Sequence, residues 1–213
     1  MKTVNSHLLS FDPLEKKVAF ITDENGQQIM TYVTEPAGVR LCENGDVEFC
    51  VFAPNAKKVE VAGITGTLPN TKIPLQKGEN GFFTGHISGI APGFHYTDYF
   101  IDDVISVNYL APLCYGCFAP TSFLDIPETE DDFYLCKAVP HGDVHMDLFH
   151  SSVTDLEKCC FVYTPPGYDE AKDTCYPVLY LQHGVGENET SWVWQGKLNY
   201  IMDNLMPIRR VRK

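Results

Sequence analysis

The stretch that decides the fold runs from Val47 to Ala62 and reads VEFCVFAPNAKKVEVA. Its first six residues are mostly apolar, a turn at Pro54 and Asn55 interrupts them, and residues 59–62 then alternate apolar with other side chains. Proline and asparagine favour turns, whereas a period of two is typical of a strand with one buried face. The stretch therefore predicts two short strands joined by a turn.

The same pattern continues along the chain in both directions. Residues 81–87 and 93–102 are further strand-like runs, the second with aromatic side chains at alternate positions, and Gly, Pro or Asn separates the runs. Short strands at a spacing of about 8–12 residues are typical of an all-β sandwich. We therefore predict a mainly β chain, with a lead-in over residues 1–36 and a β-sandwich domain over residues 37–128.

The acidic stretch Asp125–Asp132 is the best linker candidate, and the chain changes character after it. Residues 160–164 and 176–182 are predicted strands, the second apolar enough to be buried on both faces. Residues 192–206 are predicted to form a helix with a core-facing apolar stripe. The stripe consists of Trp194, Leu198, Ile201 and Leu205. A strand, a glycine-bearing loop and a helix indicate the start of an α/β domain over residues 129–213.

Residues 183–187, which read HGVGE, follow the predicted buried strand directly. Glycines at the end of a strand let the backbone turn sharply and expose N–H groups. Such donors stabilise the oxyanion of an acyl-transfer intermediate if a nucleophile lies opposite. The same pattern also serves ordinary strand-to-loop turns, and a histidine such as His183 is often structural, so a purely structural role stays open.

Several segments around this loop occur together in a characteristic order. They are Val139–Val144, Tyr163–Asp169, Tyr176–Glu189 with Trp192, Gln195–Asn199 and Asp203–Leu205. This set resembles the opening of carbohydrate esterase family one, which includes feruloyl and acetyl-xylan esterases and is related to enterochelin esterases. Residues 52–61 together with Gly93–Tyr96 resemble the Ig-like, early-set module of the glycogen-branching type that often precedes these esterases. The resemblance covers residues 37–206.

The resemblance implies an Ig-like β-sandwich followed by the first strands and helix of an α/β-hydrolase fold, acting on feruloyl or acetyl esters of plant polysaccharide. It places His183, Gly184, Val185 and Gly186 at the oxyanion pocket, with Glu187 and Trp192 near the acyl or sugar group. The nucleophilic serine of the family is absent, since no serine here has glycine two residues before and two after it. The acid and histidine that follow it are absent too. We therefore expect a C-terminally truncated esterase that is inactive as it stands.

A carbohydrate-binding or purely structural β-sandwich is the alternative. Sugars stack on exposed aromatic rings, and Tyr96 and Tyr99 are the candidate sugar contacts. Aromatic side chains in strands are usually packed in a core, however. Both tryptophans, Trp192 and Trp194, also lie outside the predicted sandwich.

The charge of the chain restricts its partners. A formal net charge of -12 argues against nucleic acid, because phosphate binding needs clustered Lys and Arg. No apolar run reaches the roughly 20 residues of a membrane helix. Polysaccharide or a small ester remains as partner, and we expect no cofactor. An exposed edge of the incomplete α/β domain would allow homo-oligomers. Without a signal peptide we expect a cytoplasmic protein, or a secreted or periplasmic one if a signal was removed.

The eight cysteines are predicted to be reduced, because several lie in apolar strand-like runs and the chain is too long to need disulfides. Cys114 and Cys117 have CxxC spacing, but no second pair completes a tetrahedral zinc site. We therefore predict no metal site. The basic end at Arg209–Lys213 does not continue the esterase resemblance, which fits a frameshift or a gene-boundary origin.

Overall fold

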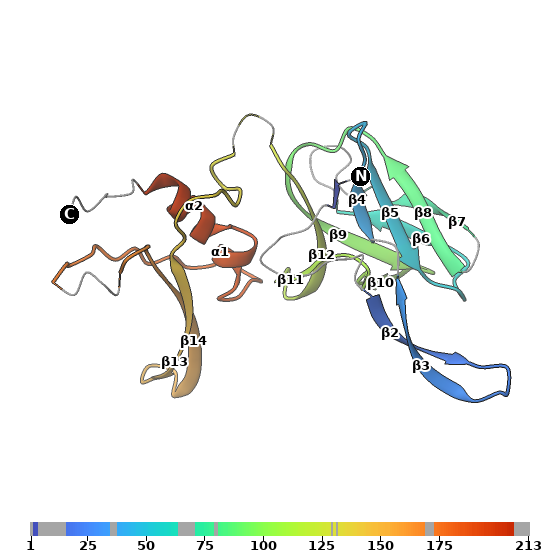
Figure 1. Ribbon diagram of the computed structural model, residues 1–213, viewed down its shortest axis with the longest axis horizontal. Helices are drawn as coiled ribbons and strands as arrows, with labels where there is room; N and C mark the ends of the chain where they lie inside the picture. The colour runs from blue at the N-terminus through green and yellow to red at the C-terminus, as the bar shows by residue number, and fades with distance from the viewer. Residues whose placement is uncertain are drawn as a thin grey trace. The chain divides into compact units, whose positions relative to one another are not determined.

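Two units make up the chain in a computed structural model (Figure 1). The β unit comprises Met1–Cys114 and Pro120–Ile126, and the second unit comprises Tyr115–Ala119 and Pro127–Lys213. The structure describes residues 2–3, 16–34, 38–63, 71–78, 81–128, 130, 132–168 and 173–206. The basic end at Arg209–Lys213 and much of the predicted lead-in lie outside these ranges.

Strands account for all the regular structure described in the β unit. They are β1 Lys2–Thr3, β2 Lys16–Thr22, β3 Gln28–Thr34, β4 Val39–Leu41, β5 Val47–Phe52, β6 Val59–Ala62, β7 Ile73–Lys77, β8 Phe82–Ile87, β9 Gly93–Ile101, β10 Val104–Ser106, β11 Leu113–Gly116 and β12 Ala119–Ile126. Ten of them form one sheet in the order β1-β4-β5-β8-β7-β6-β9-β12-β11, with β10 paired to β9. The remaining pair, β2 and β3, forms a separate antiparallel hairpin in the lead-in.

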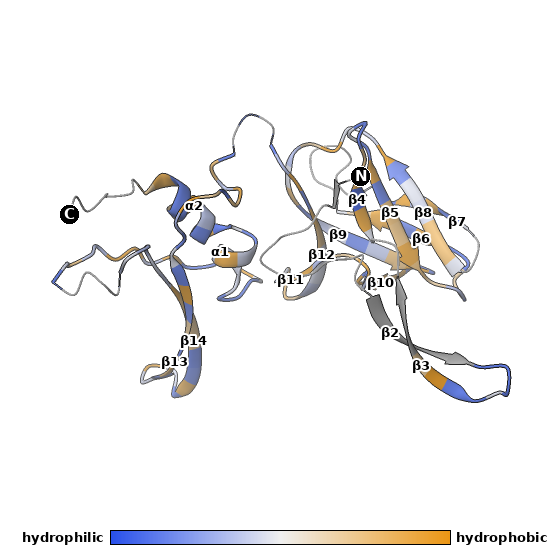
Figure 2. Ribbon diagram, in the orientation of Figure 1, coloured by the Kyte–Doolittle hydropathy of each residue, from blue (hydrophilic) through white to orange (hydrophobic). Residues whose placement is uncertain are grey.

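The large sheet curls around one hydrophobic core, and β7 is the strand at which it turns. Leu75 of β7 lies opposite Val59 of β6, whereas Gln76 lies opposite Thr84 of β8. Buried side chains from both halves of the sheet, such as Phe49 of β5 and Val59, belong to the same core cluster. The hydrophobic colouring along β5 and β6 in Figure 2 follows this core.

Alternation along the strands explains which side chains are buried. On β5, Val47, Phe49 and Val51 belong to the core cluster while Glu48 is only partly covered, and Cys50 on the other face is buried outside that cluster. A period of two places successive side chains on opposite faces of a sheet, so this register commits one face to the core. The predicted mainly β chain is confirmed.

The second unit contains a long hairpin and two short helices. Its elements are β13 Asp143–Ser151, β14 Leu156–Thr164, α1 Ser191–Trp194 and α2 Leu198–Leu205. The hairpin pairs nine residues on each side, from Asp143 opposite Thr164 to Ser151 opposite Leu156. An α/β-hydrolase arrangement is not shown, because no parallel strand pair occurs among the described residues.

The predicted buried strand at residues 176–182 is wrong. The segment has no strand pairing, and Leu179 and Tyr180 are 68% and 89% exposed. A parallel strand exists only beside a hydrogen-bonded neighbour. In the described part of the chain β13 and β14 pair with each other, so the apolar run finds no sheet to join.

The single helix predicted over residues 192–206 is also wrong, because a break separates α1 from α2. Gly196 lies in the break, and Lys197, the N-cap of α2, has a left-handed φ of 52°. The residues that α2 buries are polar, Asn199 and Asp203, while Leu205 of the predicted core stripe is 62% exposed. Polar contacts of Asp203, described below, decide which face of the helix is covered.

Candidate functional site

A shallow depression of about 290 Å³ lies on the surface of the β unit. Residues 52–56, together with Ile101 and Asp102, line it. Most of these lining residues are apolar, and Asn55 and Asp102 are the polar ones. Small-ligand sites have this composition: mostly apolar walls with a small number of placed polar groups.

The turn that follows β5 is held by hydrogen bonds from three directions. The Ala53 N–H donates to the Gly81 carbonyl at 2.9 Å, and the Ala56 N–H donates to the Ala53 carbonyl at 3.0 Å. The Lys77 ammonium donates to the Ala56 carbonyl at 2.9 Å. Gly81 has a φ of +82°, and a Cβ there would lie 2.6 Å from the Cβ of Pro54. Glycine at this position therefore permits the close packing that shapes one wall.

The opposite wall is the tight turn between β9 and β10. Asp102 and Asp103 both have positive φ, 47° and 69°, as a two-residue hairpin turn of type I′ requires. The Asp102 carboxylate accepts hydrogen bonds from the backbone N–H groups of Lys57 and Lys58, both at 2.9 Å and both through Oδ1. The carboxylate thus ties the two turns together and stands at the rim of the depression.

An aromatic pair borders this depression. The rings of Phe52 and Phe82 lie 5.0 Å apart between centroids and are tilted by 52°. Phe52 ends β5 and is 36% exposed, so part of its ring faces solvent. An exposed aromatic face offers a flat apolar surface against which the apolar face of a sugar ring can pack.

The two tyrosines predicted as sugar contacts lie on opposite faces of β9. Tyr99 is 0% exposed in the core, which excludes it as a contact and corrects the prediction. Tyr96 is partly buried and packs edge-on against Phe94, with ring centroids 5.1 Å apart, and Phe94 stacks on Phe123 at 4.9 Å. The aromatic side chains of β9 therefore supply packing on both faces of the strand.

The loop at residues 182–192 holds the predicted oxyanion residues in an exposed turn. Gly184 donates its N–H to Glu187 Oε2 at 3.3 Å, and Glu187 donates its N–H to the Gly184 carbonyl at 3.3 Å. Val185 is 92% exposed. His183 contacts only its neighbour's carbonyl through Nδ1, at 2.9 Å from Gly184 O, among the hydrogen bonds described.

Other contacts fix this loop at both ends. Gly186, with a φ of +86°, accepts a 2.7 Å hydrogen bond from the N–H of Phe118 in the 115–119 turn of the same unit. The Trp192 indole N–H donates to the Gln182 carbonyl at 3.0 Å. The loop therefore has a defined shape, but the Glu187 carboxylate occupies one of the N–H groups that an oxyanion would need.

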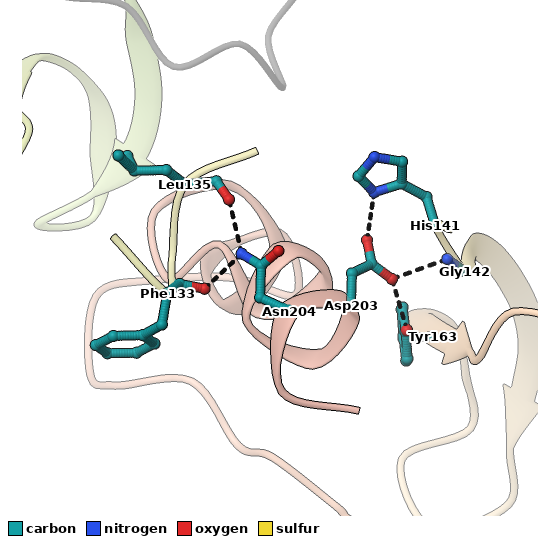
Figure 3. Close-up of polar contacts among 7 residues, drawn as sticks. All are labelled: Phe133, Leu135, His141, Gly142, Tyr163, Asp203 and Asn204. Atoms are coloured by element: carbon teal, nitrogen blue, oxygen red, sulfur yellow. Dashed lines mark hydrogen bonds and ion pairs between the residues drawn. The ribbon is translucent and has the colours of Figure 1, made fainter. Parts of the chain in front are cut away.

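Asp203 of α2 is the centre of a polar cluster in the second unit (Figure 3). Its carboxylate accepts hydrogen bonds from the Gly142 N–H at 2.8 Å and the Tyr163 hydroxyl at 2.7 Å, and it lies 2.7 Å from His141 Nδ1. Its side chain is 1% exposed. A Cβ at Gly142 would lie 2.2 Å from the Thr164 carbonyl oxygen, so only glycine lets this N–H come close enough.

Asn204, the next residue on α2, holds the chain on the other side of the helix. Its side-chain NH₂ donates to the carbonyls of Phe133 and Leu135 at 2.6 and 2.7 Å (Figure 3). The helix thus joins the 133–142 segment to β14. Sequence reasoning missed the role of Asp203. The available signal was an acidic residue placed on a helix next to, rather than within, the apolar stripe.

Three tyrosines have pKa values above the ordinary range. Burial, reinforced by the hydrogen bond to Asp203, raises the pKa of Tyr163. Burial and the neighbouring Cys136 raise the pKa of Tyr200 to about 12. Burial raises the pKa of Tyr99 to about 12, although Asn108 and Thr97 lie near enough to lower it slightly. The Tyr99 hydroxyl nevertheless has no hydrogen-bond partner of normal geometry among the described residues.

All eight cysteines are free, as predicted. Cys50 and Cys114 are buried, and burial raises the pKa of Cys50 to about 11. Cys117, Cys136 and Cys175 are exposed. Within the described ranges no group of three His, Cys, Asp or Glu side chains is placed to hold a metal ion. No described helix is long and apolar enough to cross a membrane.

Comparison with known proteins finds a family model that matches part of the β unit. Residues 36–104 match the family model for carbohydrate-binding module 48, the isoamylase N-terminal domain, which is an Ig-like β-sandwich. The chain is 35% identical over 228 aligned positions to an endo-1,4-beta-xylanase/feruloyl esterase of Xylanibacter ruminicola. That alignment covers 98% of this chain and 31% of the relative, so the chain spans about a third of the relative's length.

Two solved structures share weaker likeness. The catalytic module of the pneumococcal glycogen-degrading protein SpuA is 18% identical, with a TM-score of 0.38 over 53% of this chain and 19% of that one. A pullulanase of Paenibacillus barengoltzii is 20% identical, with a TM-score of 0.33 over 51% of this chain and 18% of that one. TM-scores this low carry no argument about fold or function.

Proposed function

We propose that this chain serves in the hydrolysis of carboxylic esters on acylated plant polysaccharide, as the part that binds the polymer. The observation that carries the proposal is the match of residues 36–104 to a carbohydrate-binding module, within a chain that aligns almost throughout with a xylanase/feruloyl esterase. The formal net charge of -12 fits a neutral polymer better than a polyanion.

In this proposal the second unit contributes one wall of an ester-binding site rather than the reacting groups. The loop at residues 183–187 and Trp192 would lie near the acyl or sugar group, as the resemblance to carbohydrate esterase family one implies. Because Gly184 donates to Glu187, that carboxylate has to release the N–H before an oxyanion can use it.

We expect no ester hydrolysis by the 213-residue chain itself. The hydroxyl groups of Ser106, Ser122 and Ser191 are engaged with backbone groups. A serine becomes a nucleophile only when a base accepts its proton. A carbohydrate-binding or structural module without catalysis is the alternative, and the same engagement of these serines favours it for the chain alone.

Two assays on the purified chain separate these roles. Affinity gel electrophoresis in soluble arabinoxylan, with bovine serum albumin as a non-binding reference, measures polymer binding, and we expect retardation that increases with xylan concentration. Hydrolysis of methyl ferulate and p-nitrophenyl acetate measures catalysis, and we expect none. Unretarded migration in xylan would reject the proposed role, and ester hydrolysis by this chain would show that the assignment of missing catalytic groups is wrong.

A further inference from the structure

Building on the proposed function, we propose that the depression between the β5–β6 turn and the β9–β10 turn is the sugar-binding site of the β unit. Its ligand would be one or two neutral pyranose units within a plant polysaccharide. Its volume of about 290 Å³ lies just below the range of enclosed small-ligand sites, which fits a shallow surface contact with a short stretch of polymer rather than a buried oligosaccharide.

The chemistry of the two walls matches a sugar ring. A pyranose has an apolar C–H face and a rim of hydroxyl groups. Phe52, Pro54 and Ile101 supply apolar surface for the face. Asn55 and Asp102 stand at the same depression, and their amide and carboxylate groups are hydrogen-bond partners for hydroxyls.

The Asp102 carboxylate also sets the charge of the ligand. Only its Oδ1 is engaged with the chain among the described residues, by the N–H groups of Lys57 and Lys58. A hydroxyl donor is favoured beside a carboxylate, whereas a uronic acid at the same position would meet like charge. The site therefore fits a neutral sugar better than an acidic one.

The site is preorganised, which a weak polymer-binding site requires. The hydrogen bonds of Ala53, Ala56 and Lys77 fix one turn, and Asp102 fixes the other. Little conformational freedom remains to be lost on binding, so a small contact area still gives measurable affinity.

A second exposed apolar surface on the same unit provides the control. Val104, Ile105, Val107 and Tyr109, on and after β10, are 65%, 63%, 43% and 46% exposed. Three of these four side chains are aliphatic, and none of them lines the depression. If sugars bound there instead, changes at Tyr109 rather than at Phe52 would weaken binding.

The test is titration of the full chain with xylohexaose, in which isothermal titration calorimetry measures Kd and NMR chemical shifts of backbone amides locate the site. We expect Phe52→Ala to raise Kd about tenfold, the equivalent of 1.4 kcal/mol of lost apolar contact. Asn55→Ala changes an exposed position outside the core, and it should raise Kd by a smaller factor, about threefold. Tyr109→Ala should leave Kd unchanged, and the largest shifts should fall on residues 52–56 and 101–103.

Three outcomes decide the matter. Unchanged affinity in both Phe52→Ala and Asn55→Ala, with loss in Tyr109→Ala, would overturn the placement of the site while leaving polysaccharide binding intact. Failure of the unmodified chain to bind xylohexaose while it is retarded by arabinoxylan would also overturn a site for one or two sugar units. Failure to bind either ligand would reject the proposed function itself. Because Asn55→Ala is a surface change, its result does not depend on whether Phe52→Ala folds.

Discussion

Replacing Asp203 by alanine should destabilise the second unit by about 3 kcal/mol. The change removes the acceptor for the Gly142 N–H, the Tyr163 hydroxyl and His141, from a side chain that is 1% exposed. A buried donor left without a partner costs about 1–3 kcal/mol. His141 has a 42% exposed side chain and recovers part of its loss from water. The Gly142 N–H and the Tyr163 hydroxyl therefore contribute about 1 to 1.5 kcal/mol each and His141 less, which sums to about 3 kcal/mol.

Native-state hydrogen exchange on the amides of α2 measures this loss directly. A decrease of about 3 kcal/mol in opening free energy corresponds to exchange roughly 150-fold faster, as long as the helix remains protected at all. Asp132→Ala is the matched control, because its carboxylate contacts Lys137 at 2.6 Å but is 62% exposed, and we expect no measurable change. Asp203→Asn keeps one acceptor oxygen and should lie between the two. Equal exchange rates in Asp203→Ala and Asp132→Ala would refute the claim that this carboxylate holds the second unit together.

Three further predictions concern packing and titration. Gly38→Ala should destabilise the β unit by about 3 kcal/mol or more in urea unfolding, because its Cβ would lie 2.4 Å from the backbone carbon of Leu110. Gly45→Ala is the control: its Cβ meets nothing within 4 Å, so the change should cost only about 1 kcal/mol for its φ of +87°. Equal losses of stability in the two variants would contradict the steric reason. Tyr99→Phe should leave stability unchanged or raise it by about 1 kcal/mol, since it removes a buried hydroxyl without a well-placed partner; a large loss in thermal unfolding would mean that the hydroxyl is bonded after all. In a titration followed by absorbance at 295 nm, Tyr200 should ionise near pH 12. Because the pKa of Tyr200 in the folded state lies above the unfolded value of about 10, its contribution to stability is complete below pH 10 and is lost as the pH rises toward 12. Ionisation of every tyrosine near pH 10 in the folded protein would contradict this.

Local sequence patterns were sufficient to predict strands whose burial and hydrogen bonding depend on neighbouring strands of the same unit. Val47–Phe52 is a mostly apolar run that ends before the turn at Pro54 and Asn55, and it forms the predicted strand and pairs with β4 and β8. The alternation on β9 was equally clear, but a period of two does not say which face is the core, so Tyr99 stayed among the candidate sugar contacts although it is buried.

Prediction failed where a segment depends on partners that its own residues do not specify. An apolar run such as 176–182 predicts a buried strand only if another strand lies beside it, and none does among the described residues. The helix pattern of residues 192–206 was read through Gly196, where the backbone breaks. The depression was missed because its lining residues, 52–56 and 101–102, are far apart in the sequence and meet through the pairing of β6 with β9 and the hydrogen bonds of Asp102.

Retention of the purified chain on insoluble feruloylated arabinoxylan tests the central claim most directly. The same polymer stripped of its esters by alkali is the comparison, because the proposed site recognises sugar rings and not the acyl group. We predict equal retention on both polymers and release by soluble xylohexaose. Passage through both columns without retention would contradict the assignment of this chain as the polysaccharide-binding part of an esterase.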